Sequence, residues 1–557
     1  MKANYLILVL FLVFLGCKGQ ENKEENEIGK TETVEMPFLW ENANIYFLLT
    51  DRFNNGNPDN DVNFDRNDET AVLRGFEGGD LQGITQKIES GYFNELGVNA
   101  IWMTPIVEQI HGSTDEGTGV TYGFHGYWAK DWTAIDPNFG TTDDLKALVE
   151  AAHENGIRIL LDAVINHTGP VTDIDPVWPE EWVRTEPKCE FQSYETTITC
   201  TLVKNLPDIK TESNDDVELP PQLVSKWKEE GRYDQEMAEL DAFFERTGHP
   251  RAPRFYIMKW LTDYITDYGI DGYRVDTVKH TEEYVWQEFK KECDYAFEKY
   301  KEDHPDKVLD NNPFYLVGEV YNYFISSGNM FNMGDVEVDF FKDAFKSLIN
   351  FDLKANADRK SYEELFTSYS NILSNELKDY SVLNYVTSHD DGSPYDKDRT
   401  KPFKAANWLF LTPGASQIYY GDEMARTLTV EGTQGDATLR SVMDWDQVVS
   451  NGAILEHWKK LGTFKSNHPS VGAGSHEMIS ESPYVFSRKY STNNVEDIVV
   501  IGLELNTGAK SIDVSDAFSD GDTVRDAYSG VQAEVNNGKV EINTDHNILL
   551  LELNNKK

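Results

Sequence analysis

The sequence predicts a closed (β/α)8 barrel, with a domain inserted after its third strand and an antiparallel β-sandwich at its C-terminal end. Three observations predict this fold: eight short apolar runs alternate with amphipathic segments, one connection is far longer than a loop, and alternating β-type segments follow residue 463. Parallel strands buried on both faces read as continuous apolar runs. A length of 557 residues suits a large barrel with attached domains.

The eight apolar runs define the predicted barrel, which should span residues 37–463. Amphipathic segments such as 143–155 fill most of the intervals, so we expect each strand to be followed by a helix, as in a TIM barrel. The predicted strands are residues 45–50, 100–103, 157–161, 272–275, 314–317, 348–351, 382–386 and 416–420.

The connection after the third strand, residues 168–252, exceeds ordinary loop length and predicts an inserted subdomain. It contains Cys189 and Cys200, whose close spacing predicts a disulfide in an exported protein. Cys293 lies in a helical pattern and is expected to be a buried free thiol. Residues 464–557 alternate apolar and polar positions between turn signals, which predicts the terminal sandwich.

The N-terminal residues 1–17 have the features of a secretory signal, with a charged start and an apolar run too short for a permanent membrane span. A small residue directly before Cys17 resembles a bacterial lipoprotein processing site. A lipid anchor on Cys17 is therefore expected, with plain secretion as the alternative. Residues 18–36 read as a polar tether. The sequence predicts export to the periplasm or outer cell surface, with membrane contact only through this anchor.

The composition excludes several classes of protein. Lys and Arg number 51 against 96 Asp and Glu, a net charge of -45 that disfavours nucleic acid as a partner. A 39% hydrophobic and 26% charged content fits neither a disordered chain nor a membrane bundle. The 12% aromatic content suits a protein that grips a neutral ligand, such as a sugar polymer, by stacking.

Charged or imidazole side chains follow four of the apolar runs. In a barrel the C-terminal ends of all strands open on one mouth, so these groups should converge. Any one of them alone is more often a cap or an ion-pair partner, but four strands that each place an acid at the same mouth favour catalysis. These residues are Asp162, Asn166, His167, Arg274, Asp276, Glu319, His389 and Asp390.

Cleavage of a glycosidic bond needs such carboxyl groups, because one protonates the leaving oxygen while another attacks or stabilises the anomeric carbon. Arg274 lies two residues before Asp276, on the same side of the strand, and would keep that aspartate ionised and nucleophilic. Glu319 is the better acid, because partial burial and the negative charge of Asp276 both raise a carboxyl pKa.

Four segments resemble, in order, the signature regions of glycoside hydrolase family 13, the α-amylase family. The resemblance covers the chain from about Asn44 to the C-terminal sandwich, and the inserted segment looks like the family's domain B. Residues 206–212 and 276–280 look most like the bacterial periplasmic α-amylases. The four segments are residues 162–167, 272–280, 318–319 and 388–390.

The resemblance implies a role for each matching residue. Asp276 would be the nucleophile, Glu319 the general acid/base and Asp390 the carboxylate that holds sugar hydroxyls, with Arg274 orienting Asp276. Tyr127 matches the family's stacking platform, and for Trp128 plain core packing is an equal alternative. The lysine–histidine pair 279–280 is found on the leaving-group side in α-1,4-acting members. The other implied sugar contacts are His167, Lys279, His280 and His389.

The resemblance also implies Ca²⁺ as a cofactor, bound by hard oxygen ligands. At a first site the ligands would be Asn166, Asp208 and the backbone carbonyl of His280. A second site resembles a calcium loop of some relatives, although Asn55 stands where Asp is common and an oxygen-rich turn without metal is the alternative. The residues of this second site are Asn55, Asn57, Asn60, Asp61, Gly78 and Asp80.

The leading hypothesis is a retaining, endo-acting α-amylase that hydrolyses α-1,4 bonds of starch, glycogen or maltodextrins. Two alternatives stay open: a related transglycosylase or hydrolase of cyclodextrin or pullulan, and a surface starch-binding lipoprotein without turnover. The intact set of Asp276, Glu319 and Asp390 argues against the second, because binding alone would not require all three. The sequence leaves product length, endo or exo attack and oligomeric state open.

Overall fold

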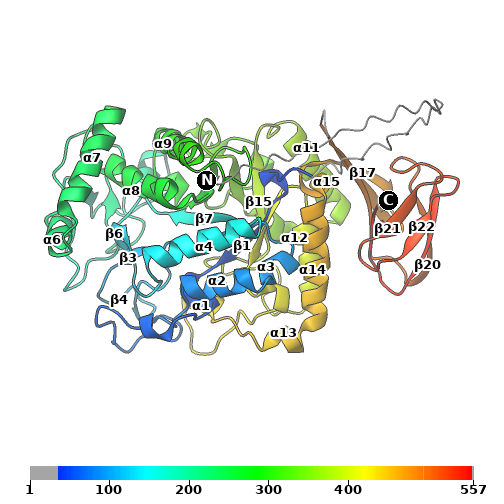
Figure 1. Ribbon diagram of the computed structural model, residues 1–557, viewed down its shortest axis with the longest axis horizontal. Coiled ribbons are helices and arrows are strands. Elements are labelled where there is room, and N and C mark those ends of the chain that lie inside the picture. The colour runs from blue at the N-terminus through cyan, green and yellow to red at the C-terminus, as the bar shows by residue number, and fades with distance from the viewer. Residues whose placement is uncertain (1–35, 493–494, 555–557) are drawn as a thin grey trace, which may run out of the picture. The chain divides into compact units, whose positions relative to one another are not determined.

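Eight parallel strands close the barrel, as the sequence predicts (Figure 1). The structure is a computed structural model that describes residues 36–492 and 495–554. Around the barrel the strands follow the order β1-β16-β15-β14-β11-β10-β7-β2. Each predicted apolar run is one of them: β1 Asn44–Leu48, β2 Ala100–Met103, β7 Arg158–Ala163, β10 Gly272–Val275, β11 Tyr315–Gly318, β14 Ser347–Asn350, β15 Ser381–Tyr385 and β16 Ala415–Tyr419.

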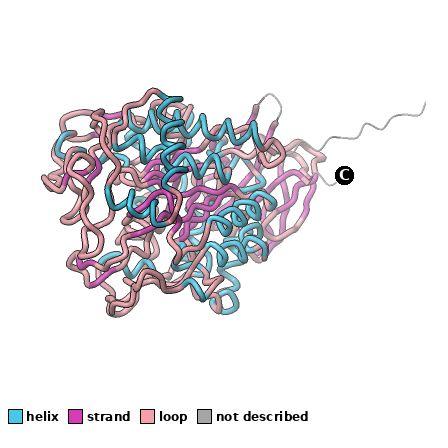
Figure 2. The backbone as a smooth tube through the Cα atoms, turned by 60° about the vertical axis from the view of Figure 1, so that its left-hand side comes forward, coloured by secondary structure: helices cyan, strands magenta, loops and turns pink. Residues whose placement is uncertain are grey.

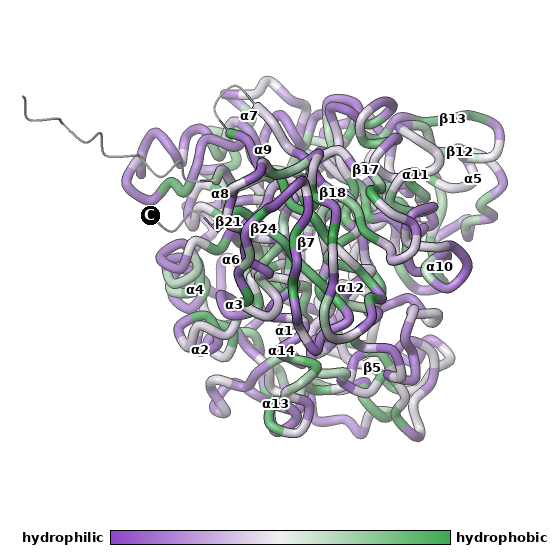
Figure 3. The backbone as a smooth tube through the Cα atoms, turned by 90° about the vertical axis from the view of Figure 1, so that its right-hand side faces the viewer, coloured by the Kyte–Doolittle hydropathy of each residue, from purple (hydrophilic) through white to green (hydrophobic). Residues whose placement is uncertain are grey.

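Every residue of these eight strands is buried, which explains why the sequence shows continuous apolar runs. Figure 2 shows the strands in magenta with cyan helices beside them. Figure 3 shows the green, apolar stretches of the chain gathered towards the middle of the view and the purple loops around them.

Helices cover the barrel and begin at clear sequence signals. Thr141 and Ser361 each form a capping box with the acid three residues later, so α4 and α11 start directly after them. The longer helices are α2 Leu81–Glu89, α4 Thr142–Glu154, α8 Pro253–Tyr268, α9 Glu283–Asp303, α11 Tyr362–Ser374, α12 Pro402–Leu411 and α14 Gly452–Asn467. The short ones are α1 Thr50–Phe53, α3 Tyr92–Glu95, α10 Asp352–Asn356, α13 Gln447–Ser450 and α15 Pro469–Ala473.

One barrel strand is not followed by an α-helix, so that expectation is wrong for β11. Residues 319–346 instead form a 3-10 turn and the small β12–β13 hairpin, Phe331–Asn332 with Glu337–Val338. Gly328 and Gly334 both adopt positive φ, at 61° and 102°, which interrupts any helix in this segment.

The segment after β7 contains a two-stranded sheet and three helices. These elements are β8 Val183–Arg184, β9 Asp208–Ile209, α5 Glu195–Ile198, α6 Pro221–Glu229 and α7 Tyr233–Thr247. The predicted disulfide is confirmed, because Cys189 and Cys200 are bonded, and Cys293 is a buried free thiol as expected. The boundaries of an inserted domain, 168–252, stay a prediction, since Met36–Lys557 forms one contact unit.

Antiparallel strands form the C-terminal part of the chain, beginning at Ser475 after α15. A six-stranded sheet, β17-β18-β19-β24-β21-β22, shares a buried apolar cluster with the β20–β23 pair. The strands are β17 Ser475–Ser480, β18 Tyr484–Ser491, β19 Glu496–Leu503, β20 Gly508–Asp513, β21 Thr523–Asp526, β22 Gln532–Glu534, β23 Lys539–Thr544 and β24 Leu549–Leu553.

Residues 1–35 lie outside the described residues, and so do the predicted signal and the lipid attachment at Cys17. Both remain predictions. Within residues 36–492 and 495–554, no helix combines the length and the apolar composition that a membrane crossing requires.

Candidate active site

Arg274 is the centre of a group of carboxylates at the barrel mouth. It lies on β10, is 1% exposed, and its Nη1 lies 2.7 Å from Asp276 Oδ1. Its Nη2 lies 2.9 Å from Glu319 Oε2, and Nη1 also lies 3.0 Å from Asp162 Oδ1. The strand register brings these residues together, because Arg274 is aligned with Asp162 of β7 and Val317 of β11. One guanidinium therefore orients two of the three carboxyl groups that the sequence assigns to catalysis, Asp276 and Glu319.

Glu319 has the environment of a proton donor. It follows β11, is buried, and its pKa is raised to about 8 by burial and by the negative charges of Asp390 and Asp276. The positive charge of Arg274 and a 3.1 Å hydrogen bond from the Thr277 backbone N–H oppose this rise. A carboxyl group that is neutral at neutral pH can protonate a leaving oxygen.

Asp390 and His389 reach the same mouth from the end of β15. Burial and the charge of Asp276 raise the pKa of Asp390, against the effect of Arg274 and Arg440. The His389 ring stacks on Tyr127, with centroids 5.4 Å apart and planes at 19°. Burial and the charges of Arg440 and Arg274 lower the pKa of His389, so that it is neutral at neutral pH.

Asp162 holds the Tyr127 side chain in place. This aspartate lies in the motif 162–167, and the sequence assigns it no individual role. The Tyr127 hydroxyl donates to Asp162 Oδ2 at 2.9 Å, and Trp102 Nε1 donates to the same oxygen at 3.1 Å. His167 Nε2 lies 3.1 Å from the Tyr127 carbonyl oxygen. Trp128 is 5% exposed, with its ring edge-on to a neighbouring histidine, which fits the core-packing alternative.

A cavity of about 1070 Å³ opens beside Tyr127 and Trp128, which is large enough to hold a small molecule. It lies between the hairpin of β4 Thr114–Asp115 and β5 Val120–Thr121 and residues of the segment after β7. Among the lining residues that sequence reasoning did not find, Arg74, Asp436 and Arg440 form a charged cluster. Asp436 lies 3.0 Å from Arg74 and 2.5 Å from Arg440. No motif marks them, since they are distant in sequence from the strand ends.

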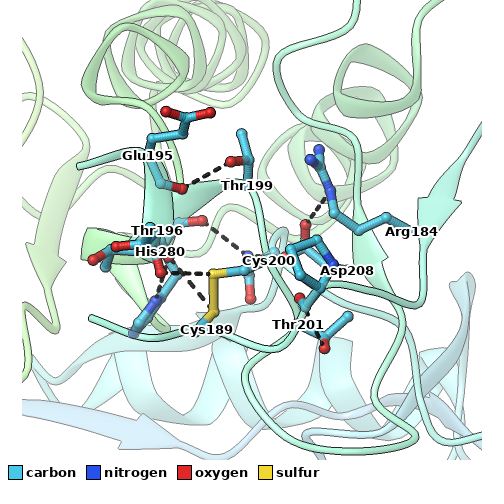
Figure 4. Close-up of a disulfide and its surroundings, with 12 residues drawn as sticks. Arg184, Cys189, Glu195, Thr196, Thr199, Cys200, Thr201, Asp208 and His280 are labelled. Carbon is cyan, nitrogen blue, oxygen red and sulfur yellow. Dashed lines mark hydrogen bonds and ion pairs between the residues drawn. A yellow bond between two sulfur atoms is a disulfide. The ribbon is translucent and has the colours of Figure 1, made fainter. Parts of the chain in front are cut away.

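The three predicted ligands of the first calcium site converge. Asn166 Nδ2 lies 2.8 Å from Asp208 Oδ1 and 3.1 Å from the carbonyl oxygen of His280. The oxygen and nitrogen of an amide group occupy equivalent positions. Rotating the Asn166 amide by 180° would therefore place its oxygen beside the oxygens of Asp208 and His280. Arg184 lies beside this group, with Nε 2.8 Å from Asp208 Oδ2 (Figure 4). The donor set fits a hard cation such as Ca²⁺.

The second predicted calcium loop is also assembled. A Cβ atom on Gly78, which has φ 90°, would lie 2.5 Å from Asn55 Nδ2 and 2.7 Å from Asp61 Oδ1, and Asn60 Oδ1 is buried without a hydrogen-bond partner. Asp80 differs, since its carboxylate accepts from three backbone N–H groups. The Asn57 side chain likewise accepts from a backbone N–H.

Among the described residues, no group of three or more His, Cys, Asp or Glu side chains could hold a metal ion. Calcium at either loop would therefore depend on amide and backbone oxygens as well as carboxylates. The buried Asn60 oxygen without a hydrogen-bond partner and the close approach of Asn55 and Asp61 to Gly78 fit a bound calcium ion.

A closed (β/α)8 barrel whose mouth holds a buried acid beside an arginine-paired carboxylate is the arrangement of a glycosidase. Residues 47–467 match the family model described as alpha amylase, catalytic domain, and the chain belongs to this α-amylase family. It is an amylase-type glycoside hydrolase. The family prediction from four short motifs is confirmed.

Curated relatives and solved structures agree with this family. The chain is 34% identical over 533 residues to the periplasmic alpha-amylase of Escherichia coli (strain K12), covering 84% of this chain and 73% of that protein. It is 26% identical to a cyclomaltodextrin glucanotransferase of Thermoanaerobacterium thermosulfurigenes, covering 90% and 65%. An α-amylase structure from Geobacillus thermoleovorans, complexed with acarbose, matches with a TM-score of 0.65 at 23% identity, covering 94% and 100%.

Proposed function

We propose that the protein is a retaining, endo-acting α-amylase that hydrolyses internal α-1,4 bonds of starch, glycogen or maltodextrins. The observation that carries this proposal is the bridge that Arg274 makes between Asp276 and Glu319. It holds a carboxylate and a protonated acid beside each other, as double displacement at an anomeric carbon requires. The similarity to a periplasmic alpha-amylase supports the substrate class.

In the first step, Glu319 gives its proton to the glycosidic oxygen while Asp276 attacks the anomeric carbon. The leaving glucan departs with that proton, and a glycosyl–Asp276 ester remains. In the second step, the Glu319 carboxylate takes a proton from water, which attacks the anomeric carbon and releases Asp276. The configuration is thereby retained. Asp390 holds sugar hydroxyls, and neutral His389 and His167 donate or accept hydrogen bonds without adding charge.

Calcium would stabilise the positions of loops rather than take part in these steps. Asn166, Asp208 and the His280 carbonyl would hold one ion between β7, β9 and the turn after β10. Asn55, Asn60, Asp61 and the Gly78 backbone would hold another. Bound calcium supplies positive charge that neutralises the oxygen clusters.

Export is part of the proposal. The relative named as periplasmic supports it, and a disulfide is stable in an oxidising compartment. A lipid on Cys17 would hold the enzyme at a membrane surface, and mass spectrometry of the purified native protein would detect the added acyl chains.

The first test follows the release of reducing ends from amylose, pullulan and dextran by residues 18–557 with calcium. We expect cleavage of amylose and its loss in Glu319→Gln, while Glu477→Gln, an exposed carboxylate on β17, stays active. Proton NMR of the first product should detect the α-anomer. If the unaltered protein binds amylose but does not cleave it, the proposed hydrolysis is wrong and the protein is a surface glycan-binding protein.

A second candidate is glucan transfer, which the similarity to cyclomaltodextrin glucanotransferases favours. In this reaction a sugar hydroxyl replaces water in the second step. Chromatography of maltoheptaose digests with and without excess glucose separates the two activities. Products longer than the substrate, or cyclic ones, would support transfer, whereas only shorter linear products would support hydrolysis.

A further inference from the structure

A small cavity lies between α7, α8 and the strand β6, Ala129–Ile135. Both α7 and β6 pack against α8, and Figure 1 shows these elements at the same end of the ribbon. None of the residues at the barrel mouth lines this cavity. Its volume is about 160 Å³, which is below the range of drug-sized ligand pockets, so a ligand here would have only a few heavy atoms.

Carboxylate side chains line this cavity, and the protein neutralises them only in part. Lys259 Nζ lies 2.8 Å from Glu239 Oε2 and 2.6 Å from Asp263 Oδ2. Arg232 forms an ion pair with Glu236, but it also pairs with two acids outside the cavity. The carboxylates of the cavity are Glu236, Glu239, Asp263 and Asp267.

Negative charge is in excess around Asp263 and Asp267. Within the described part of the chain, no Lys, Arg or His forms an ion pair with Asp267. Partial burial and the charges of Asp267 and Glu239 raise the pKa of Asp263 to about 7, against the effect of Lys259. An additional cation between these carboxylates would therefore be favourable. Since no group of three or more His, Cys, Asp or Glu in residues 36–492 and 495–554 could hold a metal ion, an organic cation fits better.

The indole of Trp260 is a second, independent indication of a ligand. Trp260 lines the cavity and is 1% exposed, and its Nε1–H has no hydrogen-bond partner among the residues that the structure describes. Neighbouring indoles differ, because Trp132 donates to the Val164 carbonyl at 2.9 Å and Trp227 donates to Thr133 Oγ1 at 3.1 Å. A buried N–H without a partner is unfavourable, and a ligand oxygen in the cavity would accept its hydrogen bond.

Aromatic rings form much of the remaining wall. The Trp132 and Trp260 rings are stacked, with centroids 6.3 Å apart and planes at 23°. Tyr264 and Tyr268 also line the cavity, with their ring centroids 6.1 Å apart. Aromatic faces attract an ammonium group through cation–π interactions. The walls therefore favour the same charge as the carboxylates.

We propose that this cavity binds a small amino alcohol, with its ammonium group between Asp263 and Asp267 and its hydroxyl oxygen accepting the hydrogen bond of Trp260 Nε1–H. Such a ligand supplies the one cation and the one acceptor that the cavity lacks. The site does not depend on the proposed hydrolysis of α-glucans, because it shares no residue with the barrel mouth.

The test titrates the protein with ethanolamine in phosphate buffer at neutral pH and follows binding by saturation-transfer NMR. Two probes of similar size each remove one group, since propylamine lacks the hydroxyl and propan-1-ol lacks the ammonium. We expect a dissociation constant of about 1 mM for ethanolamine, because so few atoms limit the affinity. Propylamine should bind about tenfold more weakly, and propan-1-ol should show no saturable binding.

Variants of the lining residues locate the site. Asp267→Asn, at an exposed position, should weaken ethanolamine binding about fivefold. Trp260→Phe should reduce the difference between ethanolamine and propylamine to within about twofold, because the indole N–H is gone. Asp358→Asn changes an exposed carboxylate that pairs with Lys401 outside the cavity, and it should bind ethanolamine as the wild type does.

The results that would overturn the proposal are specific. Unchanged binding of ethanolamine by Asp267→Asn, or equal binding of ethanolamine and propan-1-ol, would exclude the cation site. A preference for ethanolamine over propylamine that persists in Trp260→Phe would exclude the indole as donor. Because Trp260→Phe also removes buried volume, Asp267→Asn decides the matter if that variant does not fold. Binding that persists in Asp267→Asn but disappears in Asp276→Asn would place the amine at the barrel mouth instead.

Discussion

The guanidinium of Arg274 and the carboxyl group of Glu319 are in direct contact, with Nη2 2.9 Å from Oε2, although both side chains are almost completely buried. The same guanidinium lies 2.7 Å from Asp276. The acid and the nucleophile therefore share one cation, and a change at Arg274 alters the ionisation of Glu319. This link makes the pH dependence of the enzyme predictable.

The activity should fall at alkaline pH, because the proposed acid must carry its proton when substrate binds. Burial and neighbouring carboxylates raise the pKa of Glu319 to about 8. Below that pH the group is protonated and competent, and above it the fraction with a proton decreases tenfold per pH unit. We expect kcat/KM for maltoheptaose to decline through about pH 8. A profile that declines already below pH 6 would contradict this assignment.

Arg274→Lys should lower kcat by about a hundredfold while the chain still folds, because one ammonium group cannot hold three carboxylates in a fixed geometry. The decline of kcat/KM at alkaline pH should also move to higher pH. Arg274 lowers the pKa of Glu319, and a lysine that interacts more weakly with Glu319 would lower it less. A profile of kcat/KM against pH measures both effects. Arg525→Lys, on a partly exposed arginine of β21, is the control and should change neither. An unchanged alkaline limb in Arg274→Lys would show that the shared cation does not govern Glu319.

The barrel strands were predictable because parallel strands with two buried faces leave continuous apolar runs. The mouth residues were predictable because Asp162, Arg274 and Glu319 adjoin those runs in sequence. What the sequence did not reveal depends on contacts between distant segments: the link from Arg274 to Glu319, and the Arg74–Asp436–Arg440 cluster in the cavity. The missing helix after β11 follows from two glycines at positive φ, whose conformation a strict repeat of strand and helix ignores.

Gly78→Ala should weaken calcium binding at the N-terminal loop. An added methyl group would collide with Asn55 and Asp61, and φ 90° is strained for alanine, so we expect a lower melting temperature and a smaller gain from calcium. Gly231→Ala is a matched control, because its φ is 75° and its Cβ would meet open space. Melting curves with calcium and with EDTA measure the effect. Equal calcium-dependent gains in both variants would exclude a metal at Gly78.

His468 should stabilise the fold in a way that disappears at alkaline pH. It precedes α15, with Nδ1 2.8 Å from Asp497 Oδ1 on β19 and Nε2 2.7 Å from Glu552 Oε2 on β24. Burial opposes protonation, but the two carboxylates outweigh it and raise the pKa of His468 to about 9. The pKa of a histidine in the unfolded chain is about 6.5. Protonation of His468 therefore stabilises the folded state by about 3 kcal/mol below about pH 6.5, and this stabilisation is lost as the pH rises through about 9.

Urea unfolding at intervals from pH 6 to pH 10 measures this contribution as the difference between wild type and His468→Gln. The difference in unfolding free energy should be largest at pH 6 and smallest at pH 10, since the wild-type imidazole is neutral there and resembles the amide. His546→Gln, at an exposed histidine of the same antiparallel region, should match the wild type throughout. A difference that stays constant from pH 6 to pH 10 would mean that His468 contributes by packing alone and that its charge does not hold the helix to the sheet.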